Sequence, residues 1–461
     1  MGNTGVALGR DGAAPFTNPA TIVGIDDSKV AFSVNFLSLQ TNRFHDWHRP
    51  STVDPSFGDV SINHRAISAV RLSAVPSTLC LFISFAALKS GNSQIKEDPT
   101  PWKGGHQRFA LCLANLESED LLVPALSVRA PITAGVTTQD VSLSRKWTRA
   151  QVGPTYSAQV NDKLAVGASL QGAYTTISFI QDESSLTSAI DGTAVQSSLG
   201  AAGNGYSFDL TAILGATYEL AGLTLGASVQ VPSAHIFGSY AATLHQTFNA
   251  MAGSQATLVR GAGSFRAKPP VRLAAGVGRT GNHGTVEVDA SFDFGYAEGL
   301  ASSMQVDNTV STDGGALSSS SFNATYSART LPIVNGAIGG EYFMSHRLSV
   351  LAGLWTNLSA FPALKPAPAP SLGNLVQARA HRLGLSLGLG SYGTDGELLF
   401  GTQLGYGWGQ AIVANPYAIP NDWSVVSSSN FSALFIVAGA TNIRAIKGAI
   451  EGVERALTPG K

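Results

Sequence analysis

The stretch that decides the fold is GNTGVALGRDGAAPFTNPATIVGIDD (residues 2–27), followed after Ser28 by KVAFSVNFLSL (residues 29–39). The first part is rich in small residues and contains an Asn18-Pro19-Ala20 turn. In the second part the side chains alternate, with Val30, Phe32, Val34 and Phe36 on one face and Ala31, Ser33 and Asn35 on the other. Because side chains of a strand point alternately to its two faces, this pattern predicts a two-faced β-strand. A compact glycine-rich segment directly before such a strand predicts a plug that leads into a barrel wall.

The composition favours a barrel that spans a membrane. The chain has 461 residues, of which 44% are hydrophobic and 13% are charged, against roughly 25% charged in a typical soluble domain. No window supplies the roughly 18 uninterrupted apolar residues that a spanning helix needs. Few charges without a spanning helix are typical of a transmembrane β-barrel, whose strands satisfy one another's backbone hydrogen bonds. The alternative is a large soluble all-β protein.

Several function classes are excluded by what the sequence lacks. The net charge is −1 and no basic stripe is present, so we expect no nucleic-acid partner. No nucleophile elbow, phosphate loop or zinc-protease motif occurs, so we expect neither an enzyme nor a cofactor. The residues HDWH (45–48) supply too few ligands for a closed metal site, and we expect no metal. The start MGNTGVALGR has neither the basic nor the apolar region of a secretion signal, so we expect that a leader has been removed.

Hairpins repeat along the middle of the chain. Residues 149–179 predict two strands around an Asn161-Asp162 turn, and residues 208–231 predict two strands around an Ala221-Gly222 turn. We expect the polar stretches 182–205 and 297–330 to form long loops on the opposite side, and the stretch 117–148 to form irregular loops. Short turns on one side and long loops on the other are the usual asymmetry of membrane barrels.

The beginning of the chain resembles the FadL-type family of outer-membrane transporters for long-chain fatty acids and other hydrophobic compounds. Members open with A-L-G-x-A-G-x-A, then N-P-A, then the first strand; here ALGRDGAA (7–14) precedes Asn18-Pro19-Ala20. Residues 268–296 and 332–358 resemble two later hairpins of the family. The resemblance implies an antiparallel barrel of about fourteen strands, with residues 1–28 folded inside it as a hatch and residues 29–440 as its wall. It also implies a place in the bacterial outer membrane among its lipids, and passive uptake of hydrophobic molecules.

The resemblance and the alternation together suggest candidate site residues. For the hatch and its gating we select Gly9, Gly12, Asn18, Pro19 and Ala20, because a rigid capped turn would hold the segment in one shape. For the lumen we select Arg149, Arg272, Glu287, Asp289 and Asp293. Charges inside a barrel need partners. We therefore expect an arginine–carboxylate network that tethers the hatch, with direct contact to a ligand as the alternative.

The two cysteines, Cys80 and Cys112, lie at similar distances from the centre of the loop between their strands. In an antiparallel hairpin they would face one another, which allows a disulfide bond in an oxidising envelope. A slip of one residue would turn them to opposite faces. We favour two unpaired, buried thiols.

The end of the chain departs from the family. Residues 441–461 carry apolar side chains at helical spacing, at positions 443, 446, 450, 453 and 457, which predicts a short amphipathic helix. Packing on a partner, lying on a membrane surface and covering the barrel mouth all stay open. The alternative function is accordingly a structural barrel that binds another envelope protein through its loops or residues 442–457.

Overall fold

The computed structural model describes residues 4–25, 28–45, 66–71, 75–84, 107–132, 135–251, 253–313, 315, 317–364, 379–394, 396–415 and 422–443. The loop with residues 46–48 and the predicted helix, from residue 444 onward, lie outside this part of the chain. Two short helical segments come first, α1 (Ala14–Thr17) and the 3-10 helix η1 (Pro19–Gly24). The strands are β1 (Lys29–His45), β2 (Ala66–Arg71), β3 (Val75–Ser84), β4 (Gln107–Ile132), β5 (Gly135–Gln159), β6 (Leu164–Ala189), β7 (Ala194–Leu220), β8 (Leu223–Gln230), β9 (Ala234–Ala250), β10 (Gly253–Ala267), β11 (Arg272–Gly281), β12 (Gly284–Asp293), β13 (Leu300–Thr312), β14 (Ser318–Ala328), β15 (Ile333–Ser345), β16 (Leu348–Asn357), β17 (Arg379–Tyr392), β18 (Gly396–Asn415) and β19 (Asp422–Asn442).

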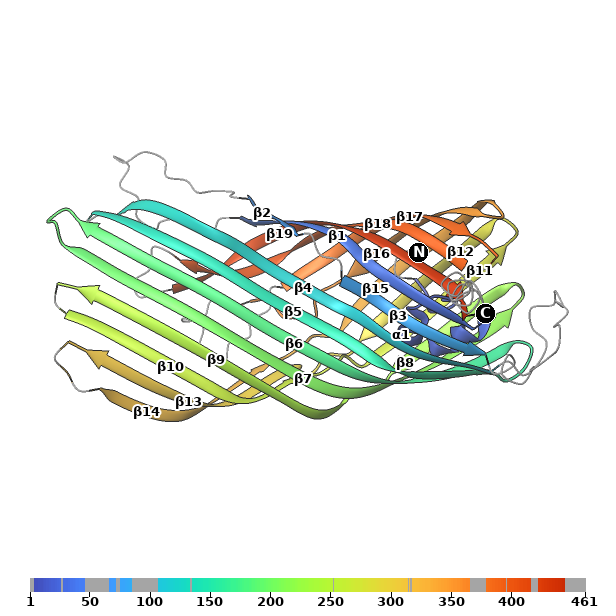
Figure 1. Cartoon of the computed structure of the whole chain (residues 1–461), viewed down its shortest axis with the longest axis horizontal. Helices are drawn as coiled ribbons and strands as arrows, with labels where there is room; N and C mark the ends of the chain where they lie inside the picture. The colour runs from blue at the N-terminus through green and yellow to red at the C-terminus, as the bar shows by residue number, and fades with distance from the viewer. Residues whose placement is uncertain are drawn as a thin grey trace, which may run out of the picture.

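These segments form one closed antiparallel barrel of fourteen wall strands (Figure 1). The barrel closes because β1 pairs with β19 along its length. Both β2 and β3 pair with β1, so they belong to one wall strand. Four further wall strands are each divided in two, as β8 with β9, β10 with β11, β12 with β13, and β14 with β15. The predicted all-β barrel of about fourteen strands is confirmed.

The four divided strands are neighbours, and their interruptions lie at one level of the wall. Residues 231–233, 268–271, 294–299 and 329–332 separate the halves, and prolines occupy three of these gaps at Pro232, Pro269, Pro270 and Pro332. Proline has no N–H to donate to a ladder, which interrupts pairing. Isolated backbone bonds still bridge the level, such as Gly299 N to Ala328 O at 2.8 Å. The wall therefore changes direction here, as Figure 1 shows for β9, β10, β13 and β14.

The outer surface of the wall is apolar and the inner surface is mostly polar. On β6 the side chains of Val166, Leu170 and Tyr174 are exposed on the outside. Ser169, Gln171 and Thr175 alternate with them and are buried inside the barrel. An apolar band facing outward around a polar interior is the pattern of a barrel that spans lipid. Among the residues that the structure describes, no helix is long and apolar enough to cross a membrane.

Several stretches that we expected to be loops are strands. The expectation of irregular loops at 117–148 is wrong, because β4 and β5 pair through it, with shifts in register between Asn115 and Glu117 and between Val123 and Leu126. The expected loops at 182–205 and 297–330 are also mostly strand, since β6 with β7 and β13 with β14 continue almost to their turns. β6 has 26 residues, whereas roughly 9–11 suffice to cross a bilayer. The wall consequently extends well beyond the apolar band, toward the end opposite the short turns (Figure 1).

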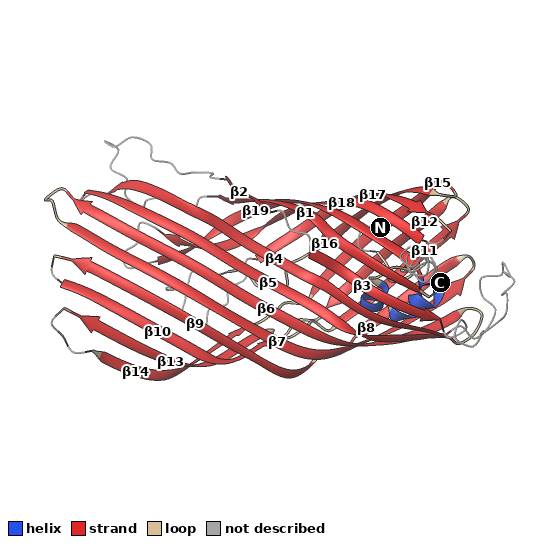
Figure 2. Cartoon of the chain, viewed as in Figure 1, coloured by secondary structure: helices blue, strands red, loops and turns tan. Residues whose placement is uncertain are grey.

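The short turns lie at the other end of the barrel. The predicted Ala221-Gly222 turn joins β7 to β8, with φ of 50° at Ala221 and 81° at Gly222. Positive φ at both central residues is the conformation that matches the twist of a two-residue hairpin. Residues 4–25 lie inside the barrel at this end, where Figure 2 shows the only helices among the described residues.

Candidate functional site: the N-terminal segment and the lumen

Asn18 organises the N-terminal segment, defined here as residues 4–25. Its side chain is fully buried, and its Oδ1 accepts a hydrogen bond from Ala20 N at 3.1 Å. Its Nδ2 donates to Val6 O at 2.6 Å and to Ala216 O, on β7, at 3.1 Å. Pro19 follows as the first residue of η1, where its missing N–H costs nothing. One amide thus caps a helix, holds the preceding loop and joins the segment to the wall.

Two carboxylates on β12 hold the loop that precedes α1. Asp289 Oδ2 accepts from Gly5 N at 2.7 Å and from Val6 N at 3.1 Å. Glu287 Oε1 accepts from Ala7 N at 2.6 Å and from Leu8 N at 3.0 Å. Both side chains are buried. A buried carboxylate is tolerated where it is well hydrogen-bonded, and bonds to a charged acceptor are stronger than neutral ones.

A row of inward-facing glycines lets the N-terminal segment touch the wall. Gly167 on β6 pairs with Gly215 on β7, and Gly226 on β8 pairs with Gly276 on β11. A Cβ at Gly215 would overlap Asn18 Oδ1, and one at Gly226 would overlap Val6 O. Gly167 lies against the Pro19 carbonyl in the same way. These positions have room only for hydrogen, because the segment's backbone lies against Gly167 and Gly226 and the Asn18 side chain lies against Gly215.

Cys80 and Cys112 form a disulfide bond, so our preference for two unpaired thiols is wrong. They are direct partners in the β3–β4 ladder, both on the inner face. The register depends on pairing that the sequence pattern alone does not fix. The Cys80 sulfur lies 3.3 Å from the Gly12 carbonyl oxygen. The disulfide therefore forms part of the surface on which the N-terminal segment rests.

An apolar cluster surrounds this disulfide. Ala14 and Phe16 of α1, with Ile22 and Ile25, pack against the inner faces of β3 and β4. Their burial removes apolar surface from the lumen, at roughly 1.5–3 kcal/mol for each fully buried large side chain. The segment is thus held by apolar packing on one side of the barrel and by the two carboxylates on the other.

The expected arginine–carboxylate network is arranged differently. Arg272 forms an ion pair with Asp293, Nε to Oδ1 at 2.5 Å and Nη2 to Oδ2 at 2.9 Å, within the β11–β12 ladder. Glu287 and Asp289 instead bind backbone amides of the N-terminal segment directly. The tether is therefore made by carboxylates and N–H groups. That arginine takes part in it stays a prediction for Arg272.

Arg108 and Lys29 also hold the N-terminal segment, and our sequence reasoning missed both. Arg108, buried on β4, donates from Nε to Ile25 O at 2.7 Å and from Nη1 to Ser84 Oγ at 2.7 Å. Lys29 Nζ lies 3.0 Å from Glu397 Oε1 and 3.5 Å from the Arg10 carbonyl oxygen. No local pattern marks either residue, because their partners come from other parts of the chain.

The remaining predicted residues divide between two places. Gly9 and Gly12 lie in the segment, where a Cβ at Gly9 would overlap Gly5 O and one at Gly12 would lie 2.9 Å from Thr78 Oγ1. Arg149 lies on β5, away from the tether, with its Nε 3.1 Å from Thr175 Oγ1 and its guanidinium over Trp147 at 5.5 Å. No group of three potential metal ligands occurs in the described part of the chain.

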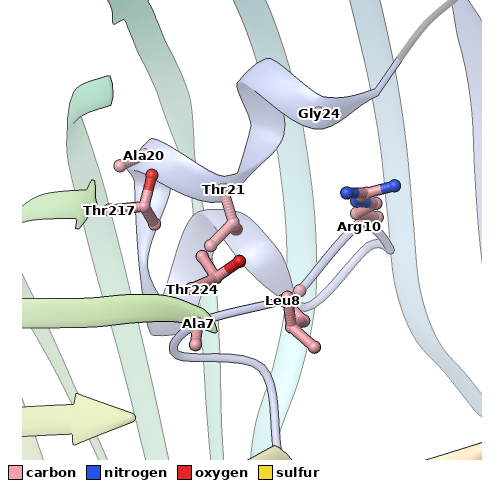
Figure 3. Close-up of a pocket in the computed structure, with 9 residues that line it drawn as sticks. Ala7, Leu8, Arg10, Ala20, Thr21, Gly24, Thr217 and Thr224 are labelled. Carbon is pink, nitrogen blue, oxygen red and sulfur yellow. The ribbon is translucent and has the colours of Figure 1, made fainter. Parts of the chain in front are cut away.

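A small cavity lies between the segment and the wall, as Figure 3 shows. Its volume is about 20 Å³, which is room for about one water molecule. It is lined by Ala7, Leu8, Gly9, Arg10, Ala20, Thr21, Gly24, Thr217 and Thr224. Residues of the segment and of the β7–β8 hairpin thus approach closely at this level of the barrel.

A second apolar cluster lies inside the barrel beyond the interrupted level of the wall. We call it the lumen cluster: Trp147, Ile177, Tyr240, Ala242, Phe265, Ala267, Leu300, Met304 and Val306. Its members come from β5, β6, β9, β10 and β13. Tyr240 and Phe265 are ring neighbours at 6.1 Å. An apolar interior at this point contrasts with the polar inner wall of β6, and an apolar lining is what a site for a hydrophobic ligand requires.

Comparison with known proteins agrees with the architecture. No family model matches the sequence, and no curated protein matches it. Among solved structures, the toluene transporter TodX of P. putida is similar at a TM-score of 0.53 and 15% identity, over 95% of this chain and 98% of that one. A deltaS2S3 mutant of the TodX monoaromatic hydrocarbon channel gives a TM-score of 0.50 and 15% identity, over 96% and 100% of the chains. A FadL homologue from Pseudomonas aeruginosa aligns at 0.47 and 12% identity, over 95% and 96%.

The chain therefore has the fold of the FadL-type channels for hydrophobic compounds, as the resemblance of its beginning predicted. At these identities the likeness concerns the fold.

Proposed function

We propose that the protein is an outer-membrane barrel through which small hydrophobic molecules enter passively, with the N-terminal segment as its hatch. The proposal rests on the arrangement of the lumen: the apolar lumen cluster lies inside the barrel, and the N-terminal segment occupies the end with the short turns. The apolar outer band supports a membrane location. The likeness to a toluene transporter supports the class of cargo. Long-chain fatty acids and aromatic hydrocarbons are both candidates.

The contacts of the hatch explain how it would be held in the barrel and how it would shift when a ligand arrives. Its carboxylate tether and the Asn18 bonds are polar and directional, so a small displacement breaks several of them together. At Gly167 and Gly226 of the glycine row the segment meets the wall through its backbone. A ligand that moves from the lumen cluster toward the hatch therefore meets a segment that is able to shift without repacking the wall. No cofactor and no energy source is required.

The experiment is uptake of radiolabelled toluene and oleate by Gram-negative cells that carry the protein in their outer membrane. We expect faster uptake of at least one compound than in cells without the protein. The double variant Glu287→Ala/Asp289→Ala removes the tether and should also admit a small polar solute such as sucrose. Asp191→Ala, in an exposed turn between β6 and β7, is the matched control. Equal uptake with and without the protein would overturn the transport proposal. Sucrose exclusion by a correctly folded double variant would overturn the role of the hatch.

A further inference from the structure

A buried polar cluster lies at the edge of the lumen cluster. Ser207 and Asp209 on β7 are fully buried on its inner face. Ser207 Oγ donates to Asp209 Oδ2 at 2.6 Å, and His235 Nδ1 lies 3.1 Å from Asp209 Oδ1. His235 is the second residue of β9, directly after the interruption at 231–233. The bulge in the β7–β9 ladder between Phe208 and Asp209 places His235 opposite Asp209.

This polar cluster is joined to the lumen cluster by a hydrogen bond. Ala267 N donates to Ser207 Oγ at 3.3 Å, and Ala267 is a member of the lumen cluster. Tyr240, five residues after His235 on β9, is another member, and its ring neighbour is Phe265. His235 therefore lies at the edge of the lumen cluster. Its side chain is 24% exposed, whereas that of Asp209 is 0% exposed.

Asp209 determines which hydrogen bond His235 offers. A carboxylate beside Nδ1 keeps the proton on that nitrogen, because Asp209 is an acceptor only. The other nitrogen, Nε2, is then a hydrogen-bond acceptor, and it has no partner among the described residues. Tyr240 Oη, which is buried, also has no hydrogen bond in the described part of the chain. Tyr240 Oη is thus a buried polar atom without a partner, which is costly unless a ligand or water meets it. His235 Nε2 belongs to a partly exposed side chain, so this acceptor is accessible to a ligand in the lumen.

We infer that this site takes a hydrophobic molecule that carries a hydroxyl group, such as a phenol, whose O–H donates to His235 Nε2 while its ring packs against the lumen cluster. The inference rests on the proposed function and narrows its cargo. A hydrocarbon without a hydroxyl would cover Nε2 and leave it without a partner. A carboxylate would approach the negative charge of Asp209, which disfavours it.

The test compares p-cresol with toluene, which differ by one hydroxyl group, by equilibrium dialysis against the full-length protein in detergent. One hydrogen bond corresponds to roughly a tenfold difference in affinity. We expect p-cresol to bind about tenfold tighter than toluene. In His235→Ala this preference should disappear while toluene affinity stays within about twofold. His235→Gln keeps an acceptor and should retain part of the preference, and Asp209→Asn should weaken it.

The matched control is His245→Ala, because His245 is on the same strand but on the exposed outer side. It should leave both affinities unchanged. Equal binding of the two compounds to the wild type, or an unchanged preference in His235→Ala, would overturn the inference and leave the proposed uptake standing. Tighter binding of p-toluate than of p-cresol would overturn the hydroxyl class. If the folded wild type binds none of the three compounds, both the inference and an aromatic cargo are wrong.

Discussion

Single residues hold the N-terminal segment in place, and the Asn18 side chain makes three hydrogen bonds there. In Asn18→Ala, Val6 O, Ala216 O and Ala20 N each lose a hydrogen-bond partner. Each buried group that is left unsatisfied costs roughly 1–3 kcal/mol. We expect amide hydrogens of residues 4–25 to exchange at least tenfold faster, measured by mass spectrometry. Asn249→Ala, at an exposed position of β9, is the control and should leave exchange in the segment unchanged.

The glycine row gives a second prediction for single residues. Gly226→Ala adds a methyl group where Val6 O now lies, so the segment must move away from β8. We expect the amide hydrogens of residues 5–8 to exchange faster. We also expect a partial leak of sucrose, of the kind predicted for Glu287→Ala/Asp289→Ala. Gly281→Ala is the control, because the nearest atom to its added Cβ is 3.8 Å away. Unchanged protection of residues 5–8 in Gly226→Ala would show that the close approach does not restrain the segment.

At the scale of elements, the disulfide joins β3 to β4 directly under α1. It closes a stretch with a sequence separation of 32 residues, for which a loss of roughly 2–4 kcal/mol on removal is typical. We expect Cys80→Ala/Cys112→Ala to unfold at lower denaturant concentration and to expose residues 12–16 to exchange. The denaturant concentration at which the variant unfolds reports the stability of the wall, and the exchange of residues 12–16 reports the contact between the wall and the N-terminal segment. If stability falls while residues 12–16 keep their protection, the disulfide supports only the wall.

The same scale shows where sequence reasoning succeeded and where it failed. Alternation at 164–170 and 223–231 predicted strands because lipid requires one apolar face there. Outside the band neither face needs to be apolar, so β6 and β7 continue through serine-rich sequence with pairs such as Ser185 to Ser197, Oγ to Oγ at 2.6 Å. The sequence of these extensions therefore has no alternation of apolar and polar residues from which a strand could be predicted. Tertiary partners were equally hidden: Glu287 was predicted to face the lumen, but its bonds to Ala7 and Leu8 cross about 280 positions of the chain.

At the scale of the whole molecule, the apolar band should occupy only part of the wall's length. Leu170 and Leu186 both lie on the outer face of β6, with exposed fractions of 49% and 46%. We place Leu170 in lipid and Leu186 beyond it. An outward-facing arginine costs roughly 2–4 kcal/mol at the bilayer midplane and about 0–1 kcal/mol near the interface. Leu170→Arg should therefore lower the free energy of unfolding in phospholipid bilayers, and Leu186→Arg should leave it nearly unchanged. Equal losses would mean that the band extends along the whole strand.

The tether between the N-terminal loop and β12 also has a consequence for biogenesis. The acceptors on β12 follow the amides of Gly5 to Leu8 by more than half of the chain. Contacts of such long range form late, because a very large loop of chain must close first. During assembly the N-terminal residues are therefore unattached on this side until β12, in the ninth of the fourteen wall strands, is in place. A barrel that has not yet reached this strand consequently lacks the contacts that hold the N-terminal loop against β12.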